Sequence, residues 1–87
     1  MKIYWIKLKG ENGRGIELGI TACDWDDATL LLNQAGRTIL DRPIEATAVE
    51  TWKEIQHADE LDQNHVVPNM GVLLRRGVWF PNLPEIQ

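Results

Sequence analysis

The densest cluster of potential metal ligands in this chain is a run of acids at Asp24, Asp26 and Asp27. Carboxylate oxygens suit a hard cation, but a calcium loop spaces its ligands differently and supplies a glycine for the turn. The three acids also stand at the start of a helical pattern, where negative charge stabilises the helix N-terminus. We therefore interpret them as helix-capping residues, and we predict no metal ion or other cofactor.

A second candidate group contains two histidines and two acids, at His57, Asp59, Asp62 and His65. Imidazole and carboxylate groups at close spacing could ligate a divalent metal or transfer a proton. A catalytic zinc requires three protein ligands with supporting hydrogen bonds, and nothing at a recognisable ligand spacing supplies such a set here. We expect these side chains to lie in a solvated loop. The distant Cys23 is expected to act as a small packing residue.

Motifs of nucleophilic catalysis or phosphate transfer are not found. The chain contains neither a GxxxxGK[ST] phosphate loop nor a GxSxG nucleophile elbow. Its glycine-rich segment, residues 13–15, is typical of a turn and is too short to indicate phosphate binding. We therefore predict no catalytic residues and no enzymatic activity.

Four tryptophans in 87 residues are the main compositional feature and the first candidates for a binding surface. Trp5 lies on the face of its strand opposite Tyr4, together with Lys7 and Lys9. Two interpretations are open. Trp5 belongs to the core, where it covers a strand glycine, or it forms an exposed aromatic patch of the kind enriched at interfaces.

Basic and aromatic side chains alternate near the C-terminus, at Arg75, Arg76, Trp79 and Phe80. Such a group could stack on single-stranded bases or hold a phosphate. A guanidinium stacked on Trp79 is an equally good interpretation. The net charge of −4 would repel a polyanion, so we do not expect nucleic acid as a partner.

Charge is distributed unevenly along the chain. Residues 1–14 carry four basic groups and one acid, whereas residues 41–62 carry seven acids and two basic groups. This pattern predicts a dipolar surface whose acidic part steers a basic partner. A merely solvated acidic face is the alternative.

Hydrophobic periodicity predicts the elements that position these residues. A β-hairpin is predicted over 2–21, because two alternating segments flank a glycine-rich turn. A helix is predicted over 24–36, with Asp24 as its N-cap, an apolar stripe on one side and Gly36 as its C-terminal cap.

The rest of the chain is less regular. Residues 46–55 fit either a strand or a helix, and their β-branched content favours the strand. A final strand region is predicted over 71–80, and a tail over 81–87 is expected to fray beyond its prolines. The pattern defines one α+β domain, residues 1–87, in which a helix packs on one face of a small antiparallel sheet.

Length and composition narrow the classes further. An 87-residue chain buries a modest core, which leaves little room for a deep substrate cavity. No apolar run is long enough for a signal peptide or a membrane span, and one cysteine excludes an internal disulfide. We therefore expect a cytoplasmic protein with no membrane partner.

The closing segments, residues 65–71 (HVVPNMG) and 76–81 (RGVWFP), resemble the end of a group of small uncharacterised bacterial proteins. Those proteins also begin with a hairpin and a short, acid-capped helix. The resemblance implies a bacterial or phage setting and no mechanism.

These observations predict a small module that binds another protein, of the kind that acts as an inhibitor or as an immunity or counter-defence protein. Edge strands of a small open sheet could also pair two copies, so a homodimer is a further possibility. The alternative is a domain that binds a small ligand or nucleotide at Arg75, Arg76 and Trp79. The residues predicted to contact a partner are Trp5, Glu50, Trp52, Glu54, Glu60, Arg75, Arg76 and Trp79.

Overall fold

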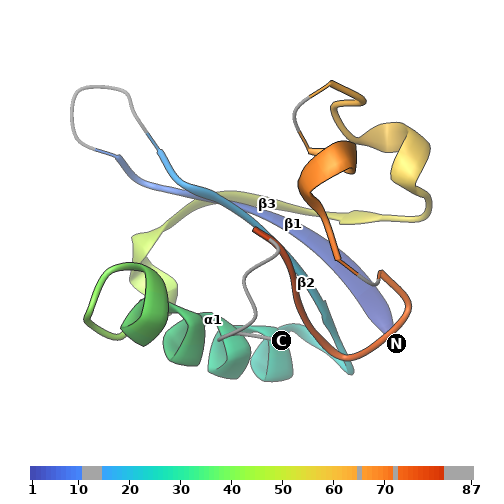
Figure 1. Ribbon diagram of the computed structural model, residues 1–87. Coiled ribbons are helices and arrows are strands. Elements are labelled where there is room, and N and C mark those ends of the chain that lie inside the picture. Colours follow the sequence, from blue (N-terminus) through green and yellow to red (C-terminus); the bar gives the residue numbers. More distant parts are fainter. Residues whose placement is uncertain (11–14, 65, 72, 82–87) are drawn as a thin grey trace.

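The computed structural model describes residues 1–10, 15–64, 66–71 and 73–81. It contains a four-stranded antiparallel sheet with the strand order β3-β1-β2-β4 and one α-helix (Figure 1). The predicted α+β class is therefore confirmed. The elements in chain order are β1 (Lys2–Leu8), β2 (Glu17–Ala22), α1 (Trp25–Ile39), the 3₁₀ turn η1 (Ala46–Ala48), β3 (Val49–Ile55), the 3₁₀ turns η2 (Ala58–Glu60) and η3 (Val67–Asn69), and β4 (Gly77–Phe80).

The predicted hairpin forms the centre of the sheet. Strands β1 and β2 pair antiparallel, with Tyr4 opposite Ile20 and Trp5 opposite Gly19. Alternate residues of both strands face α1 and are buried, as the alternating pattern predicted. This buried face is formed by Tyr4, Ile6, Leu8, Leu18, Ile20 and Ala22.

Helix α1 begins as predicted and ends three residues later than predicted. The side chain of Asp24 accepts a hydrogen bond from the backbone N–H of Asp27 at 2.8 Å, which makes it the N-cap. The helix continues through Gly36 to Ile39, and Asp41 then adopts a positive φ of 58°. A Cβ at position 36 would meet Ile44, so this glycine permits close packing and does not end the helix.

The middle segment is a strand preceded by a turn. Of the residues predicted over 46–55, the first three form η1 and the remainder form β3. Strand β3 pairs antiparallel with β1 and has an irregularity opposite Lys7 and Leu8, where Thr51 and then Val49 are the partners. Glu50 is the extra residue of this bulge.

The predicted strand over 71–80 is confined to its last four residues. Strand β4 covers Gly77–Phe80 and pairs with β2. The segment before it is held by side-chain and backbone bonds: the Thr21 hydroxyl donates to the carbonyl of Leu73, and the Gly71 N–H donates to the carbonyl of Trp79, both at 2.5 Å. Residues 82–87 of the predicted tail lie outside the described part of the chain.

The sheet is covered on both faces (Figure 1). Helix α1 covers one face, and the irregular segment from η2 to β4 crosses the other. On this second face Trp79, which is 1% exposed, lies over Gly19, and a Cβ at that position would overlap its indole ring. A tryptophan does cover a strand glycine, as predicted, but this tryptophan is Trp79 and not Trp5.

None of the helices among the described residues has the length and the apolar character that crossing a membrane would require.

We predict that Gly19→Ala lowers the free energy of unfolding by about 1–3 kcal/mol, because the added methyl group must displace a buried ring. Urea denaturation measures this loss. In a Trp79→Leu background the same substitution should cost less, since the overlapping ring is gone. Equal costs in the two backgrounds would show that the close approach of Trp79 is not the cause.

Candidate functional site

Strand β3 is the most exposed element of the sheet. It is one of the two edge strands, and its residues 50–54 are all exposed, whereas the following Ile55 is buried. Helix α1 packs chiefly against β2 and β4, and so it leaves much of the corresponding face of β3 uncovered. A large apolar side chain on this strand therefore meets solvent, and Trp52 is 48% exposed.

Trp52 is held in place by two other aromatic rings. Its indole stacks on that of Trp25, the first residue of α1, with ring centroids 4.4 Å apart and an interplanar angle of 18°. Tyr4 of β1 contacts both rings edge-on, at 5.5 Å from Trp25 and 5.6 Å from Trp52. We call these three side chains the aromatic cluster.

Negative charge lies beside the aromatic cluster. Burial of the phenol raises the pKa of Tyr4, and the neighbouring carboxylates of Glu54 and Asp24 raise it further. Tyr4 is thus an uncharged phenol with the carboxylates of Glu54 and Asp24 nearby. Aromatic faces next to carboxylates form a surface that attracts organic cations.

Sequence reasoning identified Trp52 and Glu54 at this site and missed Trp25 and Tyr4. Trp25 falls within the predicted helix over 24–36 and Tyr4 within the predicted hairpin over 2–21, and neither was among the residues predicted to contact a partner. The available signal was the position of Trp25 in the first helical turn, close in sequence to the end of β2.

The other predicted tryptophans lie on the opposite face of the sheet. Trp79 is buried. Trp5 is half-buried, and its ring stacks on Trp79 with centroids 5.9 Å apart and lies tilted against Phe80 at 5.4 Å. Trp5 is therefore largely a core residue. The indole Nε1 of Trp79 finds no hydrogen-bond partner among the described residues.

The two arginines do not join Trp79 in one surface. Arg76 forms a two-point ion pair with Asp27 at the start of α1, with Nε–Oδ2 and Nη2–Oδ1 distances of 2.8 and 2.5 Å. The Cys23 N–H also donates to Asp27, and together these bonds hold the pKa of its carboxyl well below the usual range. Arg75 is exposed. The structure therefore does not bring together the three residues predicted for the alternative ligand site, Arg75, Arg76 and Trp79.

Glu60 and His57 belong to a local turn. The Glu60 carboxylate accepts hydrogen bonds from the N–H groups of Gln56 and His57, and these bonds lower its pKa. His57 Nδ1 lies 3.3 Å from the Asp59 carboxylate, and both side chains are exposed. Within the described residues, no three His, Cys, Asp or Glu side chains lie close enough to hold a metal. His65 lies outside the described residues.

The oppositely charged segments are neighbours in the fold. Because β1 pairs with β3, Lys7 lies beside the acidic strand, and its Nζ is 3.6 Å from the Glu50 carboxylate. Part of the predicted charge separation is thereby neutralised. Glu54 forms no ion pair within the described part of the chain.

Comparison of this chain with protein-family models, curated proteins and solved structures finds no match. The resemblance of its closing segments to small bacterial proteins stays a prediction. Function is therefore inferred from the residues of the chain itself.

We predict that Asp27→Asn destabilises the protein in a pH-dependent manner. The ion pair lowers the pKa of Asp27 below its unfolded-state value of about 3.9, so its contribution is present above that pH and is lost as the pH falls. Urea denaturation should show a clear loss of stability at pH 7 that shrinks below about pH 4. Asp26→Asn, which removes an acid of the same helical turn that forms no ion pair among the described residues, is the control. A constant difference across this pH range would contradict the assignment.

Proposed function

We propose that this chain is a protein-binding module that recognises an extended, positively charged segment of another protein along β3. The observation that carries the proposal is Trp52, a large aromatic side chain 48% exposed on an edge strand of the sheet. Tryptophans that are held in a fixed orientation and remain partly exposed are the typical anchors of protein interfaces.

The free edge of β3 supports this mode of binding. In the described part of the chain, β3 is hydrogen-bonded to β1 on one side only. Its outer N–H and C=O groups can therefore accept a further strand from a partner. Such a strand would pass Trp52 and Glu54, which share the face of Tyr4 and Ile6.

Charge favours a foreign partner over a second copy. A two-fold antiparallel pairing centred on Trp52 would place Glu50 opposite Glu54 of the other copy. One centred on Lys53 would place the two Lys53 side chains opposite each other. Like charges at directly opposed positions destabilise a sheet, and the bulge at Glu50 interrupts further registers.

The acidic side chains define the partner chemistry. Glu54 and Asp24 lie beside the aromatic cluster, so lysine or arginine side chains would meet both carboxylates and aromatic faces. Electrostatic steering of such a segment accelerates encounter and weakens with salt. Blocking a basic surface in this way is how an inhibitor or an immunity or counter-defence protein acts. A cytoplasmic, bacterial or phage setting is part of the proposal.

The first test uses a synthetic peptide of alternating threonine and lysine, titrated into ¹⁵N-labelled protein. We expect saturable chemical-shift changes at the amides of β3 and weaker binding at high salt. Trp52→Ala should weaken binding at least about tenfold. The control Leu74→Ser alters another exposed apolar side chain, 83% exposed and remote from β3 in sequence, and should bind normally.

Equal binding of an alternating threonine–glutamate peptide would overturn the cationic preference. Shift changes confined to residues outside β3 would overturn the site. Concentration-dependent changes at β3 without peptide would show that a second copy occupies the edge.

A second test identifies the natural partner. A tagged chain should co-purify with a basic protein, and the single reversal Glu54→Lys should abolish the interaction. Glu54 is the informative acid, because Glu50 is paired with Lys7 and Glu60 stabilises a turn. Retention of the same partner by the Glu54→Lys variant would contradict the proposal.

A further inference from the structure

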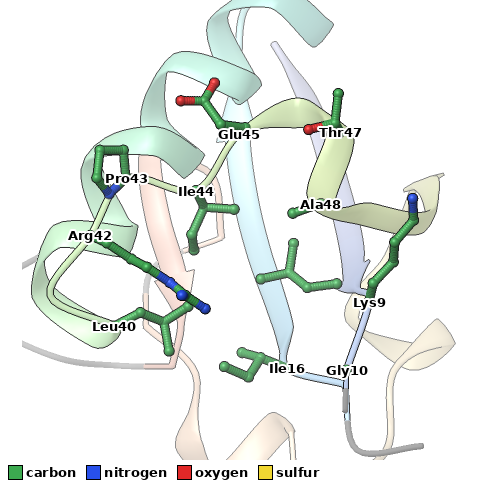
Figure 2. A pocket seen from close by; sticks show the side chains of 11 residues that line it. Lys9, Gly10, Ile16, Leu40, Arg42, Pro43, Ile44, Glu45, Thr47 and Ala48 are labelled. Carbon is green, nitrogen blue, oxygen red and sulfur yellow. The ribbon is translucent and has the colours of Figure 1, made fainter.

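A cavity of about 610 Å³ opens where the hairpin, the end of α1 and the η1 segment meet (Figure 2). It lies at the ends of β1 and α1 that are opposite to Tyr4 and Trp25, so it is separate from the aromatic cluster. Its volume falls within the range of natural small-molecule sites, roughly 300–1,000 Å³. The apolar walls are formed by Leu8, Ile16, Leu40, Ile44 and Ala48.

Backbone interactions hold these walls in place without a ligand. The Leu8 N–H donates to the Ile16 carbonyl and the Lys9 N–H donates to the Ala48 carbonyl, both at 2.8 Å. On the other side, the absence of a side chain at Gly36 lets Ile44 pack against the helix, where it is 4% exposed. The cavity is thus a consequence of the fold.

The charges at the cavity are mainly positive. Figure 2 shows the Arg42 guanidinium directed toward the cavity, with Lys9 on the opposite side and the Glu45 carboxylate directed away. Neither Arg42 nor Lys9 forms an ion pair among the described residues, whereas Lys7 and Arg76 both do. Unpaired basic groups next to an apolar cavity are notable in a chain of net charge −4.

We propose that this cavity binds a small amphipathic anion, an aliphatic chain that ends in a carboxylate. The aliphatic walls would contact the hydrocarbon chain of the ligand, and no aromatic side chain of the described residues lines them. The guanidinium of Arg42 would bind the carboxylate through two parallel hydrogen bonds, and Lys9 would add a second positive charge. This site does not depend on binding of a partner to β3.

The test is a titration of ¹⁵N-labelled protein with decanoate, followed by amide chemical shifts. We expect saturable changes at the residues that line the cavity and none at Trp52. Arg42→Gln should raise the dissociation constant about tenfold, the effect of losing one charge-assisted interaction. Arg37→Gln is the matched control, because Arg37 is an exposed arginine of the last helical turn that does not line the cavity.

Further comparisons keep the proposal falsifiable. Ala48→Phe should fill the cavity and abolish the shift changes, provided that the spectrum of the variant remains that of a folded protein. Decyltrimethylammonium carries the same chain with a positive head group and should not bind. Binding of this cation as tightly as decanoate, an unchanged affinity in Arg42→Gln, or no saturable change at the cavity would each overturn the proposal.

Discussion

The close contact between Gly19 and Trp79 is the constraint on which this small fold depends. Strand β2 lies in the middle of the sheet and is buried on both sides. Because Gly19 has no side chain, the indole of Trp79 lies directly on the strand, and Trp5 and Phe80 pack against it. These rings are the base on which the irregular segment from η2 to β4 packs. An 87-residue chain thereby obtains two cores, one on each face of the sheet.

The centre of the sheet is covered on both faces, whereas the edge strand β3 stays largely exposed. Among the described residues, helix α1 lies chiefly over β2 and β4, so the exposed stretch of β3, residues 50–54, is covered on this face by the ring of Trp25 and the edge of Tyr4. An aromatic pair contributes roughly 0.5–1.5 kcal/mol beyond the area it buries, while complete burial of a large side chain contributes about 1.5–3 kcal/mol. Trp52 gains the stacking contribution from Trp25, but only part of the burial contribution, because it is 48% exposed. The remaining apolar surface is what a partner strand would bury.

Local patterns in the sequence predicted the parts of this structure that depend on neighbours in the chain. Alternation predicted the hairpin, and the spacing of Asp24 from Asp27 predicted the helix start. Gly36 was assigned to the wrong role, because its close contact is with Ile44, which follows after a turn. The pairing of β1 with β3 joins distant segments, and no local pattern encodes it.

Individual residues of the candidate site could be predicted, but their arrangement could not, because it joins segments that are distant in the sequence. The exposed tryptophan and the acid at position 54 were identified from residue type and charge. The aromatic cluster, however, requires three elements to converge, and the Arg76–Asp27 ion pair joins residues 49 positions apart. Trp79 and Arg75 were grouped by proximity in sequence, yet one is buried and the other is exposed.

Pairing within the chain determines which charges remain available to ligands. Asp27 is bound by Arg76 and Glu50 by Lys7, so these acids contribute little to long-range attraction. Among the described residues, Glu54 forms no ion pair and lies beside the aromatic cluster, whereas Arg42 forms none and lies beside the cavity. The net charge of −4 is therefore not evenly distributed: acidic side chains lie beside the aromatic cluster at the start of α1, and basic side chains line the cavity at its end. Each surface also has its own apolar component, aromatic beside Glu54 and aliphatic beside Arg42, so the two proposed sites would take ligands of opposite charge.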